Sequence, residues 1–379
     1  MTINPETVKG FRDYDGKEAE KRAIIIEVIR STFEKYGFCP AETPIIEYED
    51  FVKGDNSQDE AVRDVFKLKD RGKRKLALRY EFTFQLKRLA KNKKLPYKRY
   101  QIGYNFRDEP IRVGRTRQFI QCDADIVGST AKDEAESLSI FKEILNALKI
   151  DYTIYINNRK LLNEILDSEN IKTNKEYIIR ELDKLDKLSK QEVKNNLKKY
   201  NAENVLDIFS KDEKFFEKYS SYQEIKDLKK FCKLFGVCVE FRPFLARGFS
   251  YYNGSVFEVW SKKLPVSICG GGSYMVGNNQ ATGISFGLEP LFLLTNLEIN
   301  LEKFLIISLN QDKQAIKLAN KMRSQNKIVS MYYGKPSKAL EYANSYGFQK
   351  VIFVGEREVK QKKFKIKIMK TGREVVLRV

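Results

Sequence analysis

The residue types best suited to chemistry gather in one stretch, Tyr104–Gly128. Two runs with strand character, Arg99–Phe106 and Gln118–Val127, flank a turn that contains proline and glycine. The stretch is therefore predicted to form a long antiparallel hairpin. Four arginines project from it: Arg107, Arg112, Arg115 and Arg117.

A row of side chains on this hairpin has the composition of a nucleotide site. Residues two apart on a strand share a face, so Arg115 and Arg117 are expected to point the same way. Phe119 and Gln121 continue that row. Guanidinium forks bind phosphates and an aromatic ring accepts a base, so this face suits a nucleotide. The alternative is an edge hairpin that its charges protect from aggregation.

The elements that must position this hairpin follow from length and composition. A chain of 379 residues exceeds one average domain, so two or three domains are expected. The net charge of +19 favours a polyanionic partner, nucleic acid first, although general solubility would also explain it. There is neither a run of 18 apolar residues nor a signal peptide, so we expect a cytoplasmic protein with no membrane partner.

The chain contains no histidine, which excludes serine–histidine and cysteine–histidine triads, histidine-ligated metals and every imidazole base. Its five cysteines are scattered, without a C-x-x-C pair, so neither a disulfide framework nor a zinc site is predicted. Any chemistry must therefore rely on other side chains, and we assign no metal-ligating residue.

Before the hairpin, apolar residues at spacings of three and four predict a helix over Glu18–Tyr36, which Gly37 ends. Val65–Leu68 and Lys75–Leu78 are predicted to be two strands joined by a turn. The second strand leads into Glu81 and Thr83 at the start of a helical run, where an acid also complements the helix dipole.

After the hairpin, a helix is expected over Lys132–Leu148 and a strand over Asp151–Ile156. Residues 160–231 are rich in Lys, Glu, Asn and Leu at helical spacing, which predicts a separate helical module.

Further on, Arg247 beside a glycine could approach a ligand closely. Tyr251 and Tyr252 follow in a strand that would put one ring on each face. Three consecutive glycines, Gly270–Gly272, permit close backbone approach, although a loop without function is also possible. From Leu301 onwards strands and helices alternate, which is typical of a mostly parallel sheet covered by helices.

Four segments of the chain resemble the motifs of one family. The hairpin sequence FRDEPIRVGRTRQFIQ resembles motif 2 of class II aminoacyl-tRNA synthetases, and of histidyl-tRNA synthetase in particular. RGFSYYNGSVFE, from Arg247 to Glu258, is similar to a motif peculiar to histidyl-tRNA synthetases. CPAETPIIE and GISFGLEPL resemble motifs 1 and 3, and the last 79 residues resemble that group's anticodon-binding domain.

The resemblance implies an α+β fold, with the antiparallel class II sheet flanked by helices. It implies a catalytic domain over residues 1–300, with the helical insertion at about 160–231, and an α/β anticodon-binding domain over 301–379. Motif 1 builds a dimer interface in the family, so a homodimer is expected. The implied activity is ligation of histidine to tRNA(His) through a histidyl-adenylate, with ATP and Mg²⁺.

Site roles also follow from the resemblance. Arg107 and Arg247 would be the catalytic cations, since attack by the histidine carboxylate on ATP needs positive charge around phosphorus and no protein base. ATP would bind to Arg107, Arg115, Arg117 and Phe119. Histidine would bind to Glu81, Thr83, Gln121, Asp125, Tyr251, Tyr252 and Tyr274.

An alternative stays open, namely a non-catalytic relative that senses histidine or tRNA as a regulatory subunit. The family has arginine over the adenine ring where this chain has Pro290, and it has other residues at Ser250, Ser273 and Met275. A complete C-terminal domain argues for the enzyme, because reading a tRNA requires that domain and sensing a metabolite does not.

Overall fold

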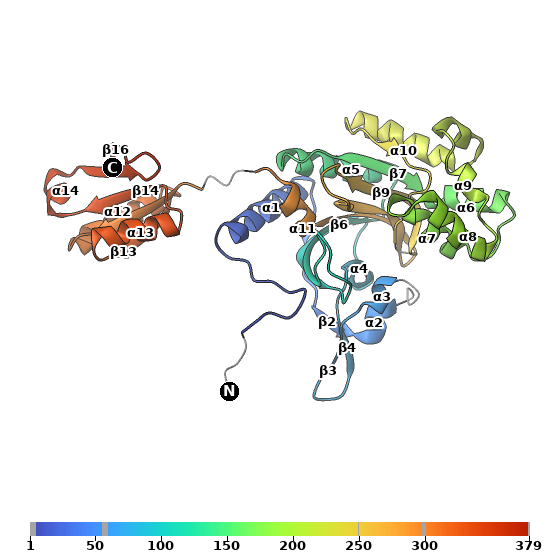
Figure 1. Cartoon of the computed structure of the whole chain (residues 1–379), viewed down its shortest axis with the longest axis horizontal. Helices are drawn as coiled ribbons and strands as arrows, with labels where there is room; N and C mark the ends of the chain where they lie inside the picture. The colour runs from blue at the N-terminus through green and yellow to red at the C-terminus, as the bar shows by residue number, and fades with distance from the viewer. Residues whose placement is uncertain (1–4, 55–59, 249, 298–300, 378–379) are drawn as a thin grey trace. The chain divides into compact units, whose positions relative to one another are not determined.

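The computed structural model describes residues 5–54, 60–248, 250–297 and 301–377 (Figure 1). The chain divides into two compact units, Met1–Leu297 and Glu298–Val379. The first unit carries the hairpin and the other residues predicted to contact ligands, namely Glu81, Thr83, Arg247, Tyr251, Tyr252 and Tyr274. Among the described helices, none combines the length and the apolar character needed to span a bilayer.

An eight-stranded sheet forms the centre of the first unit. Its strands, in spatial order, are β1 (Cys39–Pro40), β5 (Tyr97–Phe106), β6 (Gln118–Val127), β11 (Asn279–Gly287), β10 (Cys269–Val276), β9 (Tyr252–Trp260), β7 (Thr153–Asn158) and β8 (Glu240–Phe241). Neighbours pair antiparallel except β1 with β5 and β7 with β8. The β5–β6 pair confirms the predicted hairpin, and the α+β fold class is confirmed with it.

The glycine run lies inside strand β10 and does not form a loop. A side chain at Gly271 would overlap the carbonyl of Gly283 on β11, and one at Gly283 would overlap the carboxylate of Asp125 on β6. Only glycine fits at these two positions because neighbouring atoms lie so close to them. Both glycines line the cavity described below.

Three helices cover one face of this sheet: α1 (Gly16–Lys35), α5 (Ala131–Ala147) and α11 (Leu288–Leu294). Phe33 of α1 and Phe141 of α5 both pack on Phe286 of β11, with ring centroids 6.1 and 5.0 Å apart. Burial of this apolar stripe, as predicted for α1, fixes the helices to the sheet. The opposite face of the sheet stays available for the site.

The predicted helical module is present between β7 and β8. It contains α6 (Arg159–Ser168), α7 (Lys175–Asp183), α8 (Lys190–Leu197), α9 (Val205–Ile208) and α10 (Tyr222–Leu234), with 3₁₀ turns between them. Its buried side chains belong to the same apolar cluster as those of the sheet and its covering helices. The insertion is therefore packed into the first unit (green and yellow in Figure 1), so the prediction of a helical module is confirmed but the prediction that it is separate is wrong.

A small sheet, β2 (Ile46–Tyr48), β4 (Lys75–Leu78) and β3 (Lys67–Lys69), lies beside two short helices, α2 (Glu49–Lys53) and α3 (Glu60–Arg63). Strand β4 leads within five residues to α4 (Thr83–Leu89). The connecting residues are held from the hairpin, since Phe106 N donates to Arg79 O at 3.0 Å. This link places Glu81 and Thr83 next to the motif that starts at Phe106.

The second unit is a five-stranded sheet with helices. Its elements are β12 (Lys303–Ser308), α12 (Asp312–Arg323), β13 (Ile328–Tyr333), α13 (Pro336–Ser345), β14 (Lys350–Val354), α14 (Glu356–Gln361), β15 (Phe364–Ile368) and β16 (Glu374–Leu377). Strands β13, β12 and β14 are parallel, and β15 and β16 add antiparallel. The predicted alternation is confirmed, and α14 is an addition to it.

Candidate active site

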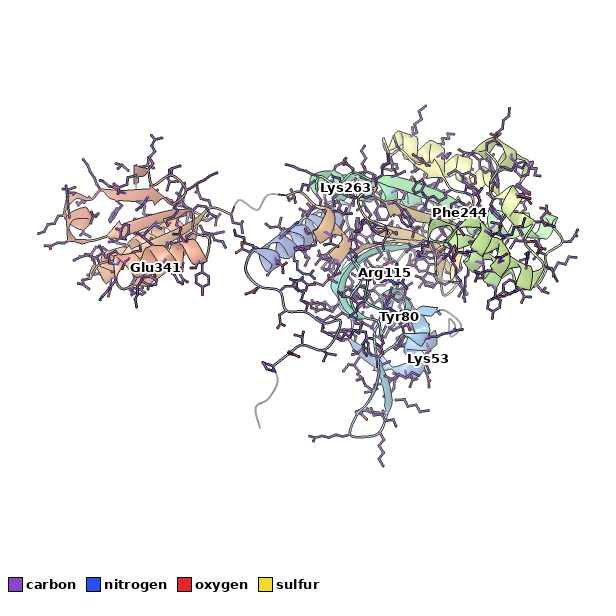
Figure 2. The ribbon with its side chains drawn as sticks, in the orientation of Figure 1. Lys53, Tyr80, Arg115, Phe244, Lys263 and Glu341 are labelled. Atoms are coloured by element: carbon purple, nitrogen blue, oxygen red, sulfur yellow. The ribbon has the colours of Figure 1, made fainter. Side chains whose placement is uncertain are left out.

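A cavity of about 190 Å³ opens on the free face of the large sheet. Its walls come from β6, β9, β10 and β11, from the start of α4 and from the turn before β9. Figure 2 shows Arg115 near the centre of the first unit, between the helical insertion and the small sheet. The predicted site residues that line the cavity are Glu81, Thr83, Arg107, Arg115, Phe119, Gln121, Asp125, Arg247, Tyr251, Tyr252 and Tyr274.

Arg117, which was predicted to bind ATP, does not line the cavity. Its side chain packs along Gly10 and forms an ion pair with Asp108 at 3.1 Å. The expected row fails because β6 begins only at Gln118, and residues 112–115 form a tight turn closed by the Arg112–Arg115 bridge. Strand alternation therefore places Phe119 and Gln121 together but says nothing about Arg115 and Arg117.

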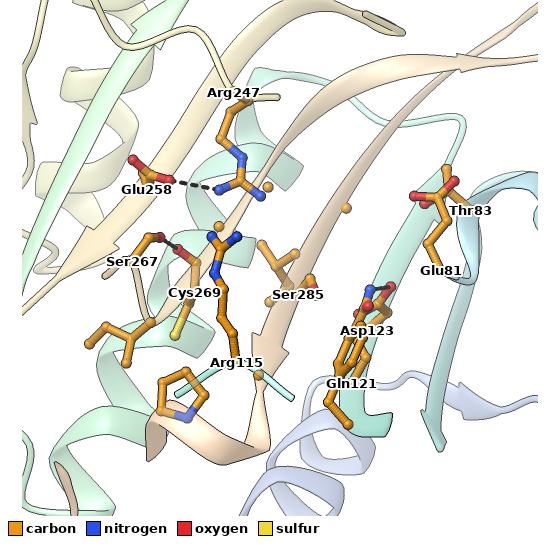
Figure 3. Close-up of a pocket in the computed structure, with 18 of the residues that line it drawn as sticks. Glu81, Thr83, Arg115, Gln121, Asp123, Arg247, Glu258, Ser267, Cys269 and Ser285 are labelled. Atoms are coloured by element: carbon orange, nitrogen blue, oxygen red, sulfur yellow. Dashed lines mark hydrogen bonds and ion pairs between the residues drawn. The ribbon is translucent and has the colours of Figure 1, made fainter. Parts of the chain in front are cut away.

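One end of the cavity is cationic. Arg107 also lines the cavity, near Glu81; its guanidinium lies 5.0 Å from the centre of the Phe119 ring, and its Nε donates to Tyr80 O at 3.2 Å. Arg115 lies 3.5 Å from the carboxylate of Glu109. In Figure 3 the Arg115 side chain extends toward that of Arg247. Two arginines that converge from different segments suit the phosphates of a nucleotide.

Arg247 is held from several sides. Its Nη1 donates to Glu258 Oε1 at 2.9 Å (Figure 3). Glu258 in turn accepts from Trp260 Nε1 at 2.9 Å. The guanidinium lies so close to Gly270 that any side chain there would overlap it. Its Nε is buried and has no hydrogen-bond partner in the described part of the chain. A cation fixed in this way at the cavity wall is suited to stabilise charge on a ligand oxygen.

The other end of the cavity is acidic. Burial raises the pKa of Glu81 to about 8, although the nearby Arg107 opposes the shift. The Tyr251 hydroxyl donates to Glu81 Oε2 at 3.3 Å. A buried carboxyl of this kind becomes charged when a ligand cation arrives, so Glu81 is suited to bind an ammonium group.

Asp125 lies deeper in the same wall. Its Oδ2 pairs with Nη2 of the fully buried Arg99 at 2.8 Å, and its Oδ1 accepts from the Tyr274 hydroxyl. Burial raises the pKa of Asp125, and the charge of Arg99 opposes that rise. Arg99 faces Asp125 directly in the register of β5 and β6, so the paired strands position both charges.

Asp123 is a cavity residue that the sequence reasoning missed. Gln121 Nε2 donates to both of its oxygens, at 3.0 and 2.8 Å (Figure 3). Burial and the neighbouring Asp125 raise the pKa of Asp123. The signal was present in the sequence, because Asp123 lies two residues from both Gln121 and Asp125 and must share their face of β6.

Tyr251 and Tyr252 correct a second expectation. Both line the cavity, with ring centroids 4.7 Å apart, and do not lie on opposite faces of a strand. The reason is that β9 begins at Tyr252, so Tyr251 belongs to the turn before it. Tyr274 completes the aromatic wall, 5.4 Å from Tyr251.

Comparison with known proteins agrees with this geometry. Residues 10–291 match the family model described as histidyl-tRNA synthetase, and residues 303–379 match the anticodon binding domain. The chain is 34% identical to histidine–tRNA ligase 1 of Bacillus cereus (strain ATCC 10987), covering 98% of this chain and 94% of that protein.

Solved structures give the same picture. The crystal structure of histidyl-tRNA synthetase from Nostoc sp. PCC 7120 superposes with a TM-score of 0.86 at 25% identity, covering 99% of this chain and 97% of that one. A Bacillus halodurans structure titled as an ATP phosphoribosyltransferase regulatory subunit/histidyl-tRNA synthetase superposes with a TM-score of 0.77 at 21% identity, covering 93% and 99%. The second likeness is one of fold.

Proposed function

The chain belongs to the histidyl-tRNA synthetase family, so its reaction is the ATP-dependent ligation of histidine to tRNA, and we propose that the cavity on the large sheet is where histidine is activated. The observation that carries this assignment is the polarity of the cavity. Arg115 and Arg247 converge at one end (Figure 3), Glu81 and Asp125 line the other, and Arg107 lies close enough to Glu81 to oppose the rise in its pKa. Such a site binds a polyanion and a cationic amino acid side by side.

In the first step the histidine carboxylate attacks the α-phosphorus of ATP, and pyrophosphate leaves. The substrate itself is the nucleophile, so the protein has only to position the reactants and to stabilise the negative charge that develops on phosphorus. Arg107 and Arg247 supply the positive charge that stabilises it. Arg115 and Phe119 hold the nucleotide, and Arg117 acts from outside the cavity by bracing Asp108.

Histidine is selected at the acidic end. Glu81 receives the ammonium group together with Thr83. Asp125, whose charge is supported by Arg99, accepts the ring N–H, and Gln121 lines the same cavity and donates to Asp123. Tyr251, Tyr252 and Tyr274 enclose the ring. A buried acceptor rewards a ring N–H and penalises an analogue without one.

The donor set is compatible with a magnesium ion that arrives with the nucleotide. The described residues include no group of three or more acidic or thiol side chains that could hold a metal by themselves. Mg²⁺ is commonly held by one or two carboxylates plus substrate phosphates. Glu109 and Glu289 lie at the cavity wall and would hold it, since Glu289 Oε2 has no hydrogen-bond partner among the described residues, and the bound ion would neutralise phosphate charge.

The second unit would hold the anticodon region of tRNA(His), and the first unit, with its insertion, would carry the aminoacylation chemistry. We further propose a homodimer through motif 1, and a location in the cytoplasm, where tRNA is charged. The regulatory-subunit alternative is not favoured, because the curated relatives that match nearly the full length are histidine–tRNA ligases.

Exchange of labelled pyrophosphate into ATP tests the activation step. We expect exchange that depends on histidine and Mg²⁺. The absence of exchange at saturating ATP, histidine and Mg²⁺ would contradict the assignment and return the regulatory subunit as the explanation.

A further inference from the structure

The turn that carries Arg247 adopts a backbone conformation that arginine avoids. Arg247 has φ +68°, in the left-handed region that favours glycine. A non-glycine residue stays there only where the surroundings hold it, and such residues gather at functional sites. The cation of the proposed reaction is therefore one whose backbone has to be restrained.

The restraint comes from the helical insertion. Asp183, the last residue of α7, accepts two backbone N–H groups on one carboxylate oxygen, Oδ1: that of Ala246 at 3.0 Å and that of Arg247 at 3.1 Å. Ala246 is fully buried, so its N–H depends on this partner. One side chain from the insertion thus fixes the two peptide groups that determine the direction of Arg247.

The same turn is anchored to the sheet at its other end. Asn157 of β7 donates its amide to Pro243 O and to Leu245 O, each at 2.8 Å. These two bonds fix the carbonyls that precede Arg247, whereas Asp183 fixes the N–H groups. Without Asp183 the turn would still be attached to the sheet. The backbone N–H of the left-handed residue, Arg247, would however lose the only acceptor that it has among the described residues.

Side-chain direction is set separately. Glu258 orients the guanidinium at 2.9 Å, and Gly270 lies beneath it. Asp183 does not itself line the cavity, and its described hydrogen bonds go to the backbone of Ala246 and Arg247, not to the guanidinium, so it does not touch a substrate. Its effect on the reaction must pass through Arg247, by the hydrogen bond to its backbone N–H and by the attraction between the two charges, and Asp183→Asn separates these two contributions.

We propose that Asp183 is a positioning residue that holds catalytic Arg247 in its left-handed conformation, so that the helical insertion takes part in histidine activation. The inference rests on the proposed function of the cavity. It makes the geometry of α7 part of the active site: a displacement of the end of α7 changes the position of the cation that stabilises the transition state.

Asp183→Ala removes both acceptor bonds and should lower the rate of histidine-dependent pyrophosphate exchange by about tenfold or more, since a misplaced group near the reacting atoms costs up to about 10²-fold. The Kd for histidine should stay within about threefold, because its proposed acidic contacts are Glu81 and Asp125. Asp183→Asn keeps an acceptor oxygen and should retain most of the rate. That variant also keeps the test valid if the alanine variant does not fold.

Asp186→Ala is the matched control. Asp186 lies three residues further along the insertion and pairs with Arg242 at 2.7 Å, at the start of the same turn. Its removal loosens the attachment of the insertion without reaching Arg247, and it should change the exchange rate by less than about threefold. An equal loss in Asp186→Ala and Asp183→Ala would overturn the proposal in favour of a general structural effect.

A double-mutant cycle gives the decisive readout. If Asp183 acts through Arg247, Asp183→Ala should add no further loss in an Arg247→Ala background. Independent, multiplicative losses would overturn the proposal, as would an unchanged rate in Asp183→Ala alone. Wild-type enzyme without any exchange would instead contradict the proposed function of the cavity, so the two failures are distinguishable.

Discussion

Replacing the buried Arg99 with methionine should destabilise the first unit in a pH-dependent way. The substitution keeps an unbranched apolar side chain and removes the charge that faces Asp125 at 2.8 Å. The Asp125 carboxylate is then buried without a counter-ion, and its pKa, which burial already raises, rises further. Removing one partner of a buried ion pair typically costs about 3–5 kcal/mol.

Proton linkage determines the sign and the upper limit of this pH-dependent loss of stability. An acid whose pKa is higher in the folded state binds more protons there than in the unfolded chain, so the stability of the folded state falls as the pH rises above the unfolded pKa. With an unfolded pKa of about 3.9 and about 1.36 kcal/mol per unit, the added cost is at most about 4 kcal/mol at pH 7 and about 1.5 kcal/mol at pH 5. Loss of the Arg99 charge also raises the pKa of Asp123, in the same direction.

Urea unfolding followed by the fluorescence of the single tryptophan, Trp260 on β9, measures this loss in the unit concerned. Asp125→Asn in the Arg99→Met background is the control, because it removes the unpaired charge and should recover at least half of the lost stability. A loss of equal size at pH 5 and pH 7, or below about 1 kcal/mol at pH 7, would refute the idea that Arg99 keeps Asp125 charged for histidine.

Three further predictions concern the ligands. Arg247→Ala should lower the exchange rate by about 10²–10³-fold with an unchanged histidine Kd, because a cation aimed at developing charge acts mainly in the transition state; an unchanged rate would contradict its role. Pro290→Arg should tighten ATP use by about 2- to 30-fold, the value of about 0.5–2 kcal/mol for a guanidinium over an aromatic face; an unaltered KM for ATP would be the contrary result. Since the pKa of Glu81 is raised to about 8, histidine binding at pH 7 should release a proton and tighten as the pH rises toward 8. Calorimetry in two buffers of different ionisation enthalpy measures that proton, and an equal release by Glu81→Gln would assign it to another group.

Local sequence patterns predicted what is local in this molecule. The two strands of the hairpin were expected at Arg99–Phe106 and Gln118–Val127 and lie at Tyr97–Phe106 and Gln118–Val127. Hydrophobic periodicity and turn residues determine such elements within a few positions. Alternation failed at Arg117 and at Tyr251 because both residues lie just outside a strand, where the two-residue period no longer applies.

Charges that meet across the fold could not be predicted in the same way. The pairing of Arg99 with Asp125 depends on the register of the hairpin, which leaves no mark on either residue alone. Asp183 is separated by 64 residues from the N–H that it holds, and nothing in a lysine-rich helical segment distinguishes it. Such contacts follow from how the insertion packs on the sheet, so they become visible only in three dimensions.

Charging of tRNA tests the central claim most directly. Purified full-length protein is incubated with tRNA(His) transcript, ATP, Mg²⁺ and each of the twenty amino acids in turn, and acid-precipitable aminoacyl-tRNA is measured. We predict charging with histidine alone, and loss of that charging when tRNA(His) is replaced by a tRNA with another anticodon and acceptor stem. Histidine binding without charging of tRNA(His) would contradict the assignment as a ligase.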